Sequence, residues 1–150
     1  MSSRYLLDTS VLSMLAPGEP ALTSEWIAWL RHHADGLYLS AVTVVEIEQG
    51  ICKLRRTGGI ERAKLLKQWL DELLATSSDR VLSLDSRVGR EAGALSDRAL
   101  ASGRHPGFAD VAIAATANAH GLVLLTRNGR HFASLGIAFI DPIEKLPAES

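Results

Sequence analysis

Three acidic residues, far apart in the chain, stand where short apolar strands and helices begin or end. Asp8 follows the apolar run 5–7, Glu46 lies near the start of the helix expected after the strand 37–42, and Asp110 lies in the first turn of the helix expected at 108–120. If the three carboxylates converge, each pair repels by about 4 kcal/mol at about 4 Å and an effective dielectric near 20. Protons or a cation must then neutralise them, and Mg²⁺ or Mn²⁺ prefers such oxygen ligands.

A divalent ion held by carboxylates suits the hydrolysis of phosphodiester bonds, because it activates water and stabilises the leaving oxygen. Each acid also has a structural explanation. Glu46 follows Thr43 by three residues and forms a capping-box pattern with it, Asp8 is a possible turn or N-cap residue, and Asp110 complements a helix dipole. Asp110, however, stands in the apolar, small-sided segment 108–117, where a carboxylate needs a partner.

The elements that position these acids alternate between strand and helix. The expected strands cover 5–7, 37–42, 81–84, 122–126 and 137–140. The expected helices cover 26–36, a segment beginning at 43, 61–75, a segment capped by Asp85 or Ser86 and running to 100, 108–120 and 130–135. This alternation predicts a three-layer α/β fold with a mostly parallel central sheet flanked by helices. In such a fold, strand carboxyl ends and helix amino ends share one edge, so we expect the three acids on one rim.

The composition is that of an ordinary globular protein, and its length fits a single domain over 1–150. The chain has 150 residues, of which 47% are hydrophobic and 22% charged, with a net charge of −1. A positive coat is therefore excluded, and nucleic-acid binding would require a local patch. Cys52 is the only cysteine, which excludes an intrachain disulfide and a cysteine zinc site. We expect a cytoplasmic protein without a membrane segment.

Four segments, in this order and spacing, resemble the PIN-domain ribonucleases, specifically the VapC-like and FitB-like toxins of bacterial type II toxin–antitoxin pairs. The matching segments are 7–10, 40–46, 109–117 and 125–128, with Phe132 following. The resemblance implies an endoribonuclease that depends on Mg²⁺ or Mn²⁺. It also implies a homodimer and a cognate antitoxin, similar to VapB or FitA, whose C-terminal segment obstructs the acidic site.

The resemblance also assigns roles to individual residues. It implies that Asp8, Glu46 and Asp110 are the catalytic metal ligands. Thr9 and Thr126 would support them, and Asn128 would serve as a fourth polar ligand. The family often has a further aspartate where this chain has His131, which leaves open whether one or two metals bind.

Three further side chains are candidate contacts to the RNA substrate: Arg127, Arg130 and His131. Guanidinium groups bind phosphate strongly, and a histidine can contact phosphate or a softer metal. The alternatives are that the two arginines are solvated loop charges and that His131 is a surface helix residue. The sequence leaves both interpretations open.

Three other classes of function are alternatives to a nuclease. A receiver-like phosphoacceptor domain also carries acids at strand ends, a threonine like Thr126 and a late lysine like Lys145. Its adjacent acidic pair is missing after the first strand, however, and no aspartate follows the strand at 37–42. A haloacid dehalogenase phosphatase would need an aspartate where Ser10 stands. A non-catalytic interaction domain would keep the acids only as caps and would bind no divalent ion.

Overall fold

The structure is a computed structural model that describes residues 3–148 and contains one five-stranded sheet. The strands are β1 Tyr5–Leu7, β2 Leu37–Ser40, β3 Val81–Leu82, β4 Val123–Leu125 and β5 Phe139–Ile140. All neighbouring pairs among them are parallel, in the order β3-β2-β1-β4-β5. The predicted α/β class and parallel sheet are confirmed. The bounds of β1 agree with the prediction, the other four strands are shorter than predicted, and the two edge strands pair over only two residues each.

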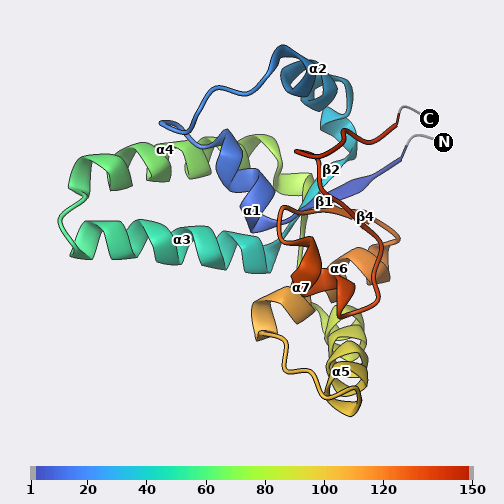
Figure 1. Cartoon of the computed structure of the whole chain (residues 1–150). Coiled ribbons are helices and arrows are strands. Elements are labelled where there is room, and N and C mark those ends of the chain that lie inside the picture. The colour runs from blue at the N-terminus through green and yellow to red at the C-terminus, as the bar shows by residue number, and fades with distance from the viewer. Residues whose placement is uncertain (1–2, 149–150) are drawn as a thin grey trace.

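Within residues 3–148, seven α-helices connect and flank the strands (Figure 1). They are α1 Thr9–Leu12, α2 Ser24–His32, α3 Ala41–Arg56, α4 Ile60–Thr76, α5 Ser86–Ala101, α6 Phe108–His120 and α7 Gly129–Ala133. Three short 3₁₀ turns cover Ser13–Leu15, Ala34–Gly36 and Ser78–Arg80. The bounds of α6 agree with the prediction. Helix α7 begins and ends earlier than the expected 130–135, and α2 ends at His32 because the chain then turns into the 3₁₀ segment.

Alternate side chains of the central strands point into two separate cores. Leu6 of β1 and Leu124 of β4 pack with residues from α5, α6 and α7. Tyr5, Leu7 and Leu125 point to the opposite face and pack with residues from α1, α2 and α4. This two-residue period is the geometry of an extended strand buried on both faces. The helices therefore form two layers around the sheet, while α3 and α4 continue outward as a pair with its own apolar contacts (Figure 1).

Helix α6 lies deep in the protein because its side chains are small and apolar. Seven consecutive residues, 111–117, are buried on all sides of the helix. The helix ends at Gly121, whose φ of 63° lies in the left-handed region, and Leu122 then donates its backbone N–H to the carbonyl of Ala117 at 2.9 Å. Glycine adopts this conformation at little cost. This turn leads directly into β4 and holds the amino end of α6 at the other edge of the sheet.

The strand order reverses beside β1, since β2 and β3 lie on one side of it and β4 and β5 on the other. Ligands of open parallel sheets bind at such a point, outside the carboxyl ends of the strands. Doubly wound proteins of the receiver type have the order β2-β1-β3-β4-β5 instead, so the topology argues against the phosphoacceptor alternative. Within residues 3–148, no helix has the length and apolar character needed to cross a bilayer.

The start of α3 differs from the prediction, which placed it at Thr43. The helix begins at Ala41, and the hydroxyl oxygen of Ser40 accepts a hydrogen bond from the backbone N–H of Val42 at 3.0 Å. Ser40 is therefore the N-cap, as its residue type permits. Thr43 is instead a buried residue of the first turn. As a consequence, Glu46 stands in the second turn of the helix and not in the first.

Candidate active site

Asp8 occupies the carboxyl end of β1, next to the end of β4. Its side chain is only 4% exposed, and its Oδ2 oxygen accepts hydrogen bonds from Ser10 Oγ at 2.8 Å and from Thr126 Oγ1 at 2.7 Å. Although Asp8 precedes α1, its side chain makes no capping hydrogen bond to that helix. Within residues 3–148 no group donates to Oδ1. The local capping explanation for this acid therefore fails, and its hydroxyl partners leave one carboxylate oxygen available.

Glu46 points toward the loop that follows β1. Thr9 donates its hydroxyl to Glu46 Oε1 at 2.6 Å and also lies 3.1 Å from the hydroxyl of Thr43, which accepts from it. The capping-box interpretation is wrong, because Thr43 is not the N-cap and the carboxylate of Glu46 contacts a threonine 37 residues away. This contact places Glu46 beside the residue that follows Asp8.

Asp110 stands in the first turn of α6, at the same edge of the sheet. Its Oδ2 lies 3.2 Å from Nδ1 of His131, and its side chain is 31% exposed. Burial raises the pKa of the Asp110 carboxyl, the neighbouring His131 lowers it, and the charge of Asp8 raises it, with a net increase. Asp8 and Asp110 are therefore close enough to repel each other.

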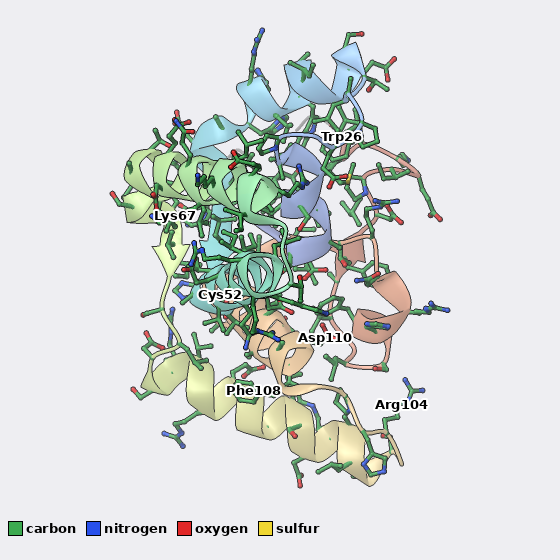
Figure 2. All side chains as sticks on the ribbon, turned by 90° about the vertical axis from the view of Figure 1, so that its left-hand side faces the viewer. Trp26, Cys52, Lys67, Arg104, Phe108 and Asp110 are labelled. Carbon is green, nitrogen blue, oxygen red and sulfur yellow. The ribbon has the colours of Figure 1, made fainter. Side chains whose placement is uncertain are left out.

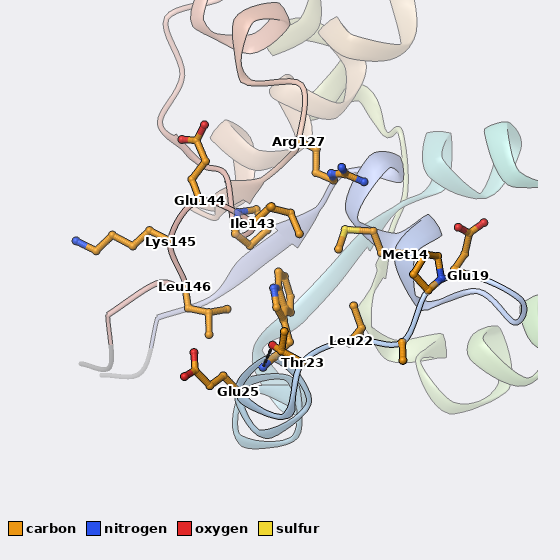
Figure 3. A pocket seen from close by; sticks show the side chains of 14 residues that line it. Met14, Glu19, Leu22, Thr23, Glu25, Arg127, Ile143, Glu144, Lys145 and Leu146 are labelled. Atoms are coloured by element: carbon orange, nitrogen blue, oxygen red, sulfur yellow. Dashed lines mark hydrogen bonds between the residues drawn. The ribbon is translucent and has the colours of Figure 1, made fainter.

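The remaining predicted site residues divide into two groups. Thr126 is fully buried, donates to Asp8 and accepts from the backbone N–H of Asn128 at 2.9 Å. The side chains of Asn128, Arg127, Arg130 and His131 are exposed. Arg130 and His131 line a cleft that also contains Asp110. The side chain of Arg127 instead lines a different hollow, of about 580 Å³ (Figure 3).

Ser10 is a site residue that the sequence analysis did not single out. Its hydroxyl donates to Asp8 Oδ2, lies 3.5 Å from Thr126 Oγ1 and accepts the backbone N–H of Arg127 at 3.1 Å. It thus ties the end of β1 to the segment after β4. The available signal was the run of hydroxyl residues directly after Asp8, because short polar side chains at such turns bond to their neighbours.

The donor set of this edge suits a hard divalent cation. Carboxylates and hydroxyls surround it, Asp8 keeps a free oxygen, and a cation would relieve the repulsion between Asp8 and Asp110. Within residues 3–148, no three His, Cys, Asp or Glu side chains are arranged to hold one metal ion. Glu46, whose carboxylate bonds to Thr9, therefore does not form a three-residue metal site with Asp8 and Asp110 in this conformation. Asp8 and Asp110 thus fit a metal as a pair, with Glu46 alongside.

The fold and the site together define a doubly wound α/β protein with paired carboxylates at the point where the strand order reverses. Comparison with family models identifies the family within this class. The PIN domain model matches residues 5–137. The chain belongs to the PIN-domain family, as the four sequence segments indicated.

Relatives match almost the entire chain. It is 36% identical over 140 residues to VapC ribonuclease Y4jK of Sinorhizobium fredii, covering 93% of this chain and 97% of the relative. It is 31% identical over 138 residues to Toxin FitB of Neisseria gonorrhoeae, covering 91% and 96%. The crystal structure of FitAcB from Neisseria gonorrhoeae superposes with a TM-score of 0.79 at 30% identity, covering 93% of this chain and 98% of that one. These matches support a toxin ribonuclease.

Proposed function

We propose that the protein is a Mg²⁺-dependent or Mn²⁺-dependent endoribonuclease that hydrolyses RNA phosphodiester bonds as the toxin of a type II toxin–antitoxin pair. The observation that carries the proposal is that Asp8, at the end of β1, and Asp110, in the first turn of α6, lie at one edge of the sheet beside its reversal point, where burial and the charge of Asp8 raise the pKa of Asp110. Two carboxylates kept together at a partly buried site need a positive partner. The similarity to a VapC ribonuclease and to Toxin FitB gives the substrate class and the biological role.

Asp8, Glu46 and Asp110 would hold the ion, with Asn128 as a further oxygen donor. A bound divalent cation supplies Lewis-acid activation of water and neutralises charge on the phosphate. Thr126 and Ser10 orient Asp8, and Thr9 orients Glu46, through the hydrogen bonds described above. Arg130, His131 and Arg127 are the proposed contacts to the RNA backbone. No side chain of the site has to form a covalent bond to the substrate.

The direct test is cleavage of a labelled single-stranded RNA in the presence of Mg²⁺ or Mn²⁺, with EDTA as the metal-free arm. Asp110→Asn should lower the rate more than about 100-fold, since even residues that only orient metal ligands contribute about 10–100-fold. Asp97→Asn, an exposed change on α5, is the matched control and should cleave normally. Cleavage that survives both EDTA and Asp110→Asn would rule out the proposal.

The proposal includes a VapB-like or FitA-like antitoxin, a homodimer, a single domain over 1–150 and a cytoplasmic location. Solved relatives include a structure of FitAB bound to a DNA fragment, with a TM-score of 0.76 at 30% identity. Exposed apolar side chains such as Val45 of α3, 54% exposed, are available for a second copy. Co-expression with an antitoxin encoded beside this gene should relieve growth inhibition, and light scattering should give twice the chain mass. Toxicity that co-expression does not relieve would refute the proposed antitoxin, and a monomeric mass would refute the homodimer.

A further inference from the structure

A cleft of about 440 Å³ opens beside the carboxylate pair, on the outer side of Asp110. Its walls are the loop 102–107, the first turn of α6 and helix α7. Asp110 and His131 line the part that belongs to the site already described. The opposite wall consists of Arg104, His105 and the turn at Gly107, none of which the catalytic arrangement uses.

The charge of this cleft is opposite to that of the acidic pair. Arg104 and Arg130 line it, and within 3–148 neither guanidinium forms a salt bridge with a carboxylate. His105 and His131 are further nitrogen donors, whereas Asp110 is the one acidic residue of the lining. Although the net charge of the protein is −1, two positive charges without a carboxylate partner lie in this cleft, next to the candidate active site. Unpaired arginines in a cleft are suited to bind phosphate oxygens.

An exposed aromatic ring adjoins the same loop. Phe108, the first residue of α6, is 71% exposed, the largest value among the exposed large hydrophobic residues. It lines an apolar groove of about 410 Å³ together with Leu84 and Val111, and Pro106 lines both this groove and the basic cleft. Figure 2 shows Arg104, Phe108 and Asp110 around the start of α6. Proteins that bind single-stranded nucleic acid commonly combine a positively charged groove with exposed aromatic rings, and this cleft and Phe108 have that combination.

We propose that Arg104 and Arg130 bind the phosphodiester backbone of a single-stranded RNA in this cleft, while Phe108 stacks against one of its bases. This inference rests on the proposed nuclease function and extends it, because it gives the RNA a path from the carboxylate pair across the start of α6. Arg104 and Phe108 are positioning residues in this scheme: they hold the strand and take no part in the chemistry. Stacking on a ring tolerates every base, so Phe108 contributes affinity more than sequence choice.

Binding is measured by fluorescence anisotropy with a labelled, cleavage-resistant 2′-O-methyl RNA in EDTA, at several KCl concentrations, using the full chain. Arg104→Ala should weaken binding about 3- to 10-fold at about 0.1 M KCl and make the salt dependence shallower by about 0.7 in slope. Arg31→Ala, an exposed arginine of α2, is the matched control and should change neither quantity. Equal effects of the two substitutions would overturn the phosphate assignment.

Phe108→Ala should weaken binding at least about 5-fold without changing the salt slope, because stacking is worth about 1–3 kcal/mol per base. Phe108→Trp should retain the affinity, whereas Phe108→Leu, which preserves apolar contact but not a ring, should lose it. Light scattering on each variant tests whether the ring belongs to a protein interface instead. Normal RNA affinity in Phe108→Leu, or dissociation of an oligomer by Phe108→Ala without loss of RNA affinity, would overturn the stacking assignment.

The outcomes separate this inference from the nuclease proposal. If the wild-type chain fails to cleave RNA with added metal but the Arg104 and Phe108 variants bind RNA less tightly, the cleft assignment holds and the nuclease proposal falls. If the wild-type chain cleaves RNA and both variants bind and cleave normally, the cleft assignment falls alone. Absence of RNA binding by the wild-type chain in EDTA would overturn the cleft assignment, while the cleavage assay with added metal tests the nuclease proposal separately.

Discussion

Thr9 donates its hydroxyl to Oε1 of Glu46 at 2.6 Å, across 37 residues of sequence. This hydrogen bond joins the residue after β1 to the second turn of α3, and it places Glu46 beside the residue that follows Asp8 although the two acids are far apart in the chain. A hydrogen bond to a charged carboxylate is stronger than one between neutral groups. Thr9 therefore orients an acid that belongs to a different element.

Thr9→Val should lower RNA cleavage about 10- to 100-fold, because Glu46 loses the donor that orients it. The valine side chain has nearly the same shape, so the fold should persist. Thr9→Ser keeps the hydroxyl and should restore most of the activity. Single-turnover cleavage rates over a range of Mg²⁺ concentrations measure the effect. A Thr9→Val protein with the wild-type rate and metal dependence would contradict the orienting role.

Thr126→Val should destabilise the fold by about 1–3 kcal/mol, because the buried Asp8 carboxylate loses one of its two hydroxyl donors. The free energy of unfolding from urea titration provides the measurement. Thr76→Val, at an exposed position near the end of α4, is the control and should have a smaller effect. Equal losses of unfolding free energy in the two variants would show that the hydrogen bond between Thr126 and Asp8 does not stabilise the fold.

Asp110→Asn should make the metal-free protein more stable at neutral pH. The folded state raises the pKa of Asp110, so it binds this proton more tightly than the unfolded state does. The ionised carboxylate consequently reduces stability as the pH rises from its ordinary pKa through the raised one. In EDTA at about pH 7.5, we expect Tm to increase on the order of 1–2 °C.

The same comparison at lower pH supplies the control for Asp110→Asn. The difference in Tm from the wild type should shrink as the pH falls below the ordinary pKa of aspartate, where the wild-type carboxyl is protonated in both states. Added Mg²⁺ or Mn²⁺ should stabilise the wild type but not the variant. A variant that is less stable than the wild type at neutral pH without metal would contradict the electrostatic argument.

His131→Ala should move the acid limb of the cleavage profile to higher pH. His131 lowers the pKa of Asp110, so its removal lets that pKa rise further above the ordinary value. The carboxylate is then protonated over a wider acidic range and is less available to a cation. Cleavage rates measured from about pH 5 to 8, the range in which histidine titrates, reveal the shift. An acid limb that stays in place or moves to lower pH would refute this role of His131.

Sequence periodicity and local chemistry predicted the elements that carry the site. The apolar run before Asp8 and the small-sided segment around Asp110 gave the correct edge of the sheet, because parallel strands joined by helices always present their carboxyl ends together. The bounds of α6 were predicted at both ends, since Gly107 and Gly121 flank an uninterrupted apolar helix. These features depend on neighbours along the chain.

Only the tertiary structure decided which side chains meet. Ser40 replaces Thr43 as the cap of α3, Glu46 pairs with Thr9, and Ser10 bridges β1 to the segment after β4. For Glu46 the local pattern offered Thr43, three residues away, whereas its partner Thr9 comes from another element. Arg127 and Arg130 likewise separate into different hollows, because the turn into α7 directs them apart. Hydrogen bonding and burial act through space, so sequence spacing alone could not rank these alternatives.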